Sequence, residues 1–151
     1  MSRMHSSKKG KSRSKLPFRL ESPAWVEFRD KKAEEIAIKV AKQGHTMSYT
    51  GLILRDHYGI PRIKLMTNKK MGQIYKESKL LPQIPEDLIA LMRKAVNLNK
   101  HLKNNPKDMS NKRGLILIEA KIKRLSDYYK QKNRIPKTWK YSIDTAEVLT
   151  K

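Results

Sequence analysis

The chain has 151 residues, of which 35 are lysine or arginine and 14 are aspartate or glutamate, so its formal net charge is +21. The absence of cysteine excludes disulfide bonds, thiolate zinc sites and cysteine nucleophiles. No apolar run approaches the roughly 18–20 residues that span a membrane, so we expect a cytoplasmic protein with no membrane partner. The charge favours a polyanionic partner, because each lysine or arginine set against a phosphate releases condensed counterions.

Residues 1–19 form the most strongly basic stretch, with seven lysine or arginine side chains, no acid and no periodic apolar face. This composition predicts a basic N-terminal tail. Two roles stay open for it: a solubilising terminus, or an arm that becomes ordered along a phosphate backbone.

Residues 20–80 are predicted to form an N-terminal helical subdomain, whose first part, 20–60, holds six basic and six acidic side chains. A first helix is expected to begin at Ser22-Pro23, since serine caps helices and proline suits the first turn. Gly44 is expected to end it. Its apolar stripe at helical spacing consists of Trp25, Phe28, Ala33, Ile36, Ala37 and Val40.

Two further helices are expected in this subdomain. One runs over about 48–58, is closed by Gly59 and cannot continue through Pro61. The other is short, at about 68–77, and is followed by LLPQIP, whose two prolines predict a linker.

Residues 81–151 are predicted to form a helical hairpin domain with a basic C-terminal extension; residues 61–151 together carry a charge of +14. Pro85 and two acids after it suit a helix start. A last short helix is expected from about Asp144. Two apolar stripes predict antiparallel packing: Leu88, Leu91, Ala95, Leu98 and Leu102, then Leu115, Ile118, Ile122, Leu125 and Tyr129.

The predicted fold class is therefore all-α. A helical hairpin or small helical bundle forms the core, with an N-terminal helical subdomain and basic extended tails. No segment has the alternation of a strand, and no internal repeat is found.

The sequence contains no pattern that predicts catalysis. Its histidines are scattered and lack metal-ligand spacing, and no glycine-rich phosphate loop is present. We therefore expect no enzymatic activity, no metal, no cofactor and no small-molecule substrate.

One face of the second long helix is basic, beside its apolar stripe. It consists of Arg113, Leu117, Lys121, Arg124 and Tyr128. Basic groups bind phosphates, and arginine or tyrosine can also stack on a base, although such a face can also be merely solvated. The alternative is a helical DNA-binding or architectural protein, because YGIP ends one short helix before another. That region is neutral, however, and a DNA-recognition helix needs phosphate-anchoring bases around it.

The connector HLKNNPKDMSNKRG is unusually rich in polar groups. A hairpin brings His101, at the end of one helix, close to Asp108 and to Ser110 or Asn111, at the start of the next. Capping by the aspartate and a favourable dipole interaction of the histidine explain part of this pattern. The other interpretation is a donor–acceptor cluster for the shallow minor groove of RNA.

The stretch HLKNNPKDMSNKRGLILIEAKIKRLSDYYK closely resembles the core signature of the universal small-subunit ribosomal protein fifteen family, numbered thirteen in eukaryotes. MSRMH with GKSRS, LRDHYGIP at 54–61 and IPKTWKYS at 135–142 resemble its longer archaeal and eukaryotic branch. The resemblance covers nearly the whole chain.

The resemblance implies a structural constituent of the small ribosomal subunit that supports assembly and translation, with ribosomal RNA and neighbouring ribosomal proteins as partners. It implies RNA contacts at a three-helix junction and a nearby minor groove of the central domain. His101 and Asp108 match the minor-groove contacts, with either Ser110 or Asn111 as the third, and Arg124 and Tyr128 match contacts on the second helix. The full predicted RNA-binding set is His101, Asp108, Ser110, Asn111, Lys112, Arg113, Lys121, Arg124 and Tyr128.

Overall fold

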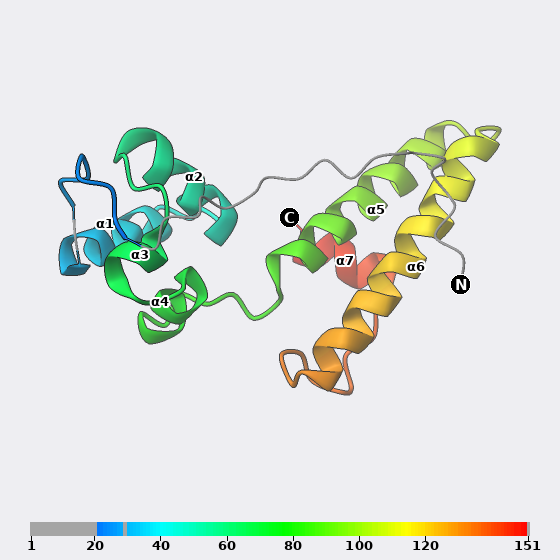
Figure 1. The fold of residues 1–151 in the computed structure, drawn as a ribbon. Coiled ribbons are helices and arrows are strands. Elements are labelled where there is room, and N and C mark those ends of the chain that lie inside the picture. Colours follow the sequence, from blue (N-terminus) through cyan, green and yellow to red (C-terminus); the bar gives the residue numbers. More distant parts are fainter. Residues whose placement is uncertain (1–20, 29, 151) are drawn as a thin grey trace.

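Helices are the only regular elements in the computed structural model, which describes residues 21–28 and 30–150 (Figure 1). The predicted all-α fold is confirmed. The predicted basic tail, residues 1–19, lies outside the described residues. The helices are α1 (Asp30–Lys42), α2 (Met47–His57), α3 (Ile63–Thr67), α4 (Met71–Glu77), α5 (Glu86–Asn104), α6 (Met109–Gln131) and α7 (Ile143–Leu149).

The four shorter helices α1–α4 pack around one apolar cluster at the N-terminal end of the described chain (Figure 1). Ala33 and Ala37 of α1 are fully buried in it, as the predicted stripe requires, and Leu54 of α2 is 1% exposed. Gly44 and Gly59 have positive φ angles of 88° and 63° and follow the ends of α1 and α2. The predicted helix stops are therefore confirmed.

The predicted start of the first helix is wrong. The helix begins at Asp30, and Ser22-Pro23 belongs to a turn in which the Val26 N–H donates to the Pro23 carbonyl at 3.2 Å. Val26 and Phe28 both pack into the apolar cluster. In a helix, side chains two residues apart point in directions about 200° apart, so both could not reach one cluster. An extended backbone places them on the same side. Trp25, placed in the buried stripe by the prediction, is 67% exposed.

The short helix expected at 68–77 is α4, and a further helix, α3, precedes it. Asn68, with φ at 54°, ends α3 in the left-handed conformation that asparagine tolerates, and α4 begins at Met71. The sequence did not predict α3, because five residues are too few to display a helical period. Tertiary packing accounts for it, since Met66 is 3% exposed beneath α1.

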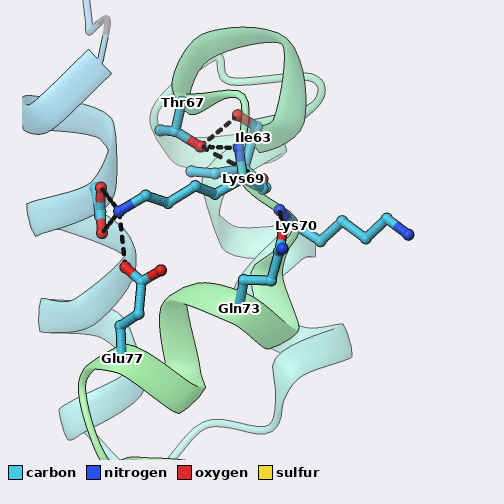
Figure 2. Close-up of polar contacts among 7 residues, drawn as sticks. Ile63, Thr67, Lys69, Lys70, Gln73 and Glu77 are labelled. Atoms are coloured by element: carbon cyan, nitrogen blue, oxygen red, sulfur yellow. Dashed lines mark hydrogen bonds and ion pairs between the residues drawn. The ribbon is translucent and has the colours of Figure 1, made fainter.

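Lys69 connects the helices of this subdomain through its ammonium group. Its Nζ lies 2.7 Å from the Glu77 carboxylate of α4 and 3.2 Å from the Glu34 carboxylate of α1 (Figure 2). The hydrogen bond to Glu77, and then that to Glu34, raises the pKa of Lys69. The subdomain thus neutralises one of its own cations internally.

The two long helices form the predicted antiparallel hairpin (Figure 1). Leu88, Ala95 and Ile122 from the predicted stripes are fully buried. Met92 is buried as well, although the stripe prediction passed over it. At the open end, the Tyr129 hydroxyl of α6 donates to Asp87 of α5 at 2.6 Å, and burial together with this bond raises the pKa of Tyr129 to about 12.

The basic C-terminal segment folds back onto the hairpin. Ile135 and Ala146 are 3% and 0% exposed and belong to the same apolar cluster as α5 and α6, and α7 packs against α5. The short helix predicted from about Asp144 is confirmed, with Ser142 as its N-cap. Its packing against α5 could not be predicted, because the segment is too short to show an apolar stripe.

Candidate nucleic-acid interface

The tip of the α5–α6 hairpin brings four polar residues of the connector together, and Figure 1 places this tip at the far end from α1–α4. The ring Nε2 of His101 lies 3.1 Å from Asp108 Oδ2. The Asn111 backbone N–H donates to Asp108 Oδ1 at 2.9 Å, and its side-chain amide donates to Oδ2 at 2.6 Å. The predicted convergence of His101, Asp108 and Asn111 is confirmed as geometry.

Asp108 is the N-cap of α6. The first four N–H groups of a helix lack partners within it, and the Asp108 side chain accepts from one of them, that of Asn111. The hydrogen bonds from the Asn111 backbone and side chain, with a further bond from His101, lower the pKa of Asp108 from 3.8 to about 2. The Asp108 carboxylate therefore stays ionised well below neutral pH.

Asn105, which the sequence analysis did not single out, completes the tip. Its side-chain amide donates to the His101 carbonyl at 3.1 Å and lies 3.4 Å from the ring Nδ1. An amide nitrogen can only donate, so Nδ1 accepts, and the network assigns the imidazole proton to Nε2, facing Asp108. An asparagine four residues after a histidine, at a helix end, is the signal that could have indicated this contact.

Access to the tip is open. The His101 and Asp108 side chains are 44% and 29% exposed, and an open hollow of about 450 Å³ lies between His101, Pro106 and Asp108. Ser110 is exposed and makes no side-chain hydrogen bond within the described part of the chain. The structure therefore places Ser110 beside the cluster, whereas Asn111 belongs to it.

The predicted basic residues of α6 all lie at the surface. Lys112, Arg113, Lys121 and Arg124 are exposed, and Tyr128 is 50% exposed. Arg124 donates from Nε to the Ala120 carbonyl at 3.2 Å, which directs its guanidinium along the helix. Tyr128 stacks edge-on against Tyr129 with ring centroids 5.2 Å apart, so an internal neighbour positions its ring.

No other chemistry competes for this interface in residues 21–28 and 30–150. None of their histidine, aspartate and glutamate side chains gather in the groups of three or more that could hold a metal ion. None of their helices combines the length and the apolar character needed to cross a membrane. The hairpin therefore presents an exposed basic face beside a polar tip, a combination typical of helical nucleic-acid-binding proteins.

Comparison with known proteins identifies the family. Residues 1–60 match the Ribosomal S13/S15 N-terminal domain family, and residues 71–149 match the Ribosomal protein S15 family. The Small ribosomal subunit protein uS15 of Methanococcus vannielii is 46% identical over 149 residues, which cover 99% of each chain. The chain belongs to the uS15 family of small ribosomal subunit proteins, as its resemblance predicted, and this family is not a class of enzymes.

Proposed function

We propose that this protein is a structural component of the small ribosomal subunit that binds small-subunit ribosomal RNA and supports assembly and translation. The observation that carries the proposal is the His101–Asp108–Asn111 network at the exposed hairpin tip of a uS15-family chain. The proposed contacts are a minor groove for the tip and the phosphate backbone for α6. Neighbouring small-subunit proteins are its other proposed partners, and the cytoplasm is its proposed location.

The hydrogen-bonding capacity of the tip supports a minor-groove contact. Asp108 Oδ2 accepts from both His101 and Asn111, whereas Oδ1 accepts only the Asn111 backbone N–H. One acceptor position on Oδ1 therefore stays available for a donor such as a ribose 2′-hydroxyl, which the shallow minor groove of RNA displays. A third contact is proposed for either Ser110 or Asn111, since each retains a donor.

The basic face of α6 suits the phosphate backbone leading away from that groove. Lys112, Arg113, Lys121 and Arg124 are exposed and form no ion pair with another described residue. Phosphate contacts of this kind set register and affinity, while groups at the tip supply selectivity. Tyr128, half-exposed beside them, can stack on an unpaired base.

The test is a binding competition with the full-length protein. A small-subunit central-domain junction RNA is compared with an unrelated RNA duplex and a DNA duplex of equal length, at several salt concentrations. We expect the junction RNA to be preferred and its binding to weaken steeply with salt. Equal affinity for both RNAs would contradict specific recognition, and preference for the DNA duplex would favour the helical DNA-binding alternative.

His101→Ala tests the tip within the same assay. We expect affinity for the junction RNA to fall roughly 5- to 150-fold, the range of a specific nucleic-acid contact. His57→Ala is the matched control, because His57 is also exposed and also lies in the last turn of a helix, but in the neutral segment 20–60.

A further inference from the structure

A second basic surface lies on the hairpin domain, away from the tip. It is a groove of about 680 Å³ between the second half of α6 and the segment that leads into α7. Lysines stand on both of its sides: Lys123 and Lys130 on α6, and Lys140 on the C-terminal segment. Ser142 also lines it. We call this feature, defined by these four residues, the lysine groove.

Two of the three lysines form no ion pair with another described residue, although two carboxylates also line the groove. Lys123 and Lys140 are exposed and form no ion pair with any other residue in the described ranges. Glu119 and Asp127 also line the groove, but Asp127 approaches only Lys130, at 3.9 Å between the charged atoms. Two ammonium groups on opposite sides of one groove are thus left for an external anion.

The lysine groove is not a continuation of the α6 basic face. With 3.6 residues per turn, the mean direction of Lys123 and Lys130 lies roughly 140° around the helix from that of Lys121 and Arg124. The buried stripe through Ile122 occupies the remaining side. The helix therefore presents three faces: one to the core, and two basic ones that point in different directions.

The fold holds the second side of the groove in place. Lys140 follows Trp139, which packs against the hairpin cluster, and precedes the Ser142 cap of α7. Ile135 and Ala146, both buried, anchor the segment on either side. Lys140 therefore projects from a packed segment, so little conformational entropy of the backbone is lost when it binds.

We propose that the lysine groove binds the phosphate backbone of a second RNA segment, so that the hairpin domain is held between two segments rather than lying on one. This inference rests on the proposed function and extends it to a new surface. The lysine groove and the α6 basic face point in different directions, so two RNA segments can reach them separately. Lysine and serine are donors that typically contact backbone phosphates without reading sequence.

An acidic protein partner is the less favoured occupant. An RNA backbone presents phosphates at regular, closely spaced intervals, which suits ammonium groups on both sides of an open groove. Free phosphate shares the same chemistry, and the experiment separates the two sources.

The experiment measures binding of the full-length protein to small-subunit ribosomal RNA as a function of salt. Three double variants each remove two positive charges. They are Lys123→Ala/Lys140→Ala in the groove, Lys121→Ala/Arg124→Ala on the α6 basic face, and Lys31→Ala/Lys39→Ala on α1 as the control. The two control lysines are exposed and lie in the neutral segment 20–60.

We expect the groove variant to reduce the slope of log affinity against log salt by about 1.4 to 1.8, since each neutralised phosphate contributes roughly 0.7–0.9. Hydroxyl-radical footprinting should show that it loses protection of an RNA segment different from the one lost in the α6-face variant. Inorganic phosphate at matched ionic strength should not displace the RNA.

Three outcomes would overturn the inference. If the groove variant binds RNA like the α1 control, RNA does not bind in the groove. If the α6-face variant is still impaired in that case, the proposed function survives. Loss of the same footprint in both variants would mean one RNA segment rather than two. Displacement by inorganic phosphate would identify a free-anion site. If no variant changes binding, the proposed function itself fails.

Discussion

The two helical regions of this protein differ in how their charges are arranged. In the N-terminal subdomain, Lys69 is paired with Glu34 and Glu77, and Arg55 with Asp56. On α6 of the hairpin domain, Lys121 and Arg124 face solvent without a carboxylate partner among the described residues. Both regions are built from amphipathic helices around an apolar cluster, so helix packing does not cause the difference. Basic side chains that gather on one helix face without a carboxylate partner in the described chain, as on α6, suit an external polyanion.

The largest effects are expected from core truncations that separate the two regions. Leu54→Ala in the subdomain and Leu88→Ala in the hairpin domain remove side chains that are 1% and 0% exposed, and each should cost about 2–5 kcal/mol of stability. Urea unfolding followed by the fluorescence of Trp139, which packs on the hairpin cluster, reports the loss in the hairpin domain. Trp25 is 67% exposed, so amide exchange in α2 is used to report the loss in the subdomain. Only Leu88→Ala should also abolish RNA binding; loss of binding in both would show that the regions act as one unit.

Changes at Asp108 should sharpen the distinction between capping and recognition. Asparagine is also a good N-cap, so Asp108→Asn should keep α6 intact but lower RNA affinity roughly 5- to 150-fold. Asp108→Ala should lower it and also increase amide exchange at the start of α6. Equal RNA binding by wild type and Asp108→Asn would mean that the carboxylate serves only the helix.

The same carboxylate predicts a pH dependence. Its pKa is lowered from 3.8 to about 2, so its contribution is complete above pH 4 and is lost as the pH falls towards 2. Amide exchange of the Asn111 N–H should accelerate in that window, as measured by NMR. The Asp108→Asn variant should show no such step between pH 4 and 2.

Removing one charge from each region tests the comparison directly. Lys69→Met leaves two carboxylates without their cation. It should lower the thermal midpoint of unfolding by a few degrees, on the order expected for loss of a small ion-pair network. RNA binding should stay unchanged. Lys121→Met should leave the midpoint unchanged and reduce the salt slope of RNA binding by about 0.7–0.9. The reverse pattern would contradict the division between internally and externally neutralised charge.

The smallest effects come from a pair of tyrosines in the hairpin domain. Tyr129→Phe removes the bond to Asp87 and should cost about 1 kcal/mol at pH 7. Because folding raises the pKa of Tyr129 from 10.0 to about 12, its contribution is complete below pH 10 and is lost as the pH rises through 12. Calorimetry at pH 7 and above pH 10 should show the gap between wild type and variant closing.

Tyr141→Phe is the matched control for that loss. The Tyr141 hydroxyl is buried without a hydrogen-bond partner among the described residues, and burial raises its pKa. Removing it should leave stability unchanged or raise it by up to about 1 kcal/mol, since no hydrogen bond is lost. A clear destabilisation would mean that the hydroxyl has a partner in solution.

The hairpin was predictable because its helices are long. The stripe that includes Leu88 and Ala95 and the stripe that includes Ile122 each repeat at helical spacing over several turns, and Pro106 separates them. The start of α1 and the existence of α3 were not predictable in this way. Val26 is buried by contacts with residues distant in sequence, and these override the local capping signal at Ser22-Pro23. Met66 is buried in the same way, and this packing forms a helix at 63–67, where the sequence shows no helical period.

The candidate interface shows the same division. The chemical types at the tip and the basic face of α6 can be read from the order of residues, because a helix places residues three and four apart on one side. The sequence alone also determines the family, the helical class and the excess charge. Only the tertiary structure decided which atoms meet across elements: Tyr129 with Asp87, and Lys140 with the second basic side of α6. Those pairs come from separate elements, and their distances depend on how the helices pack.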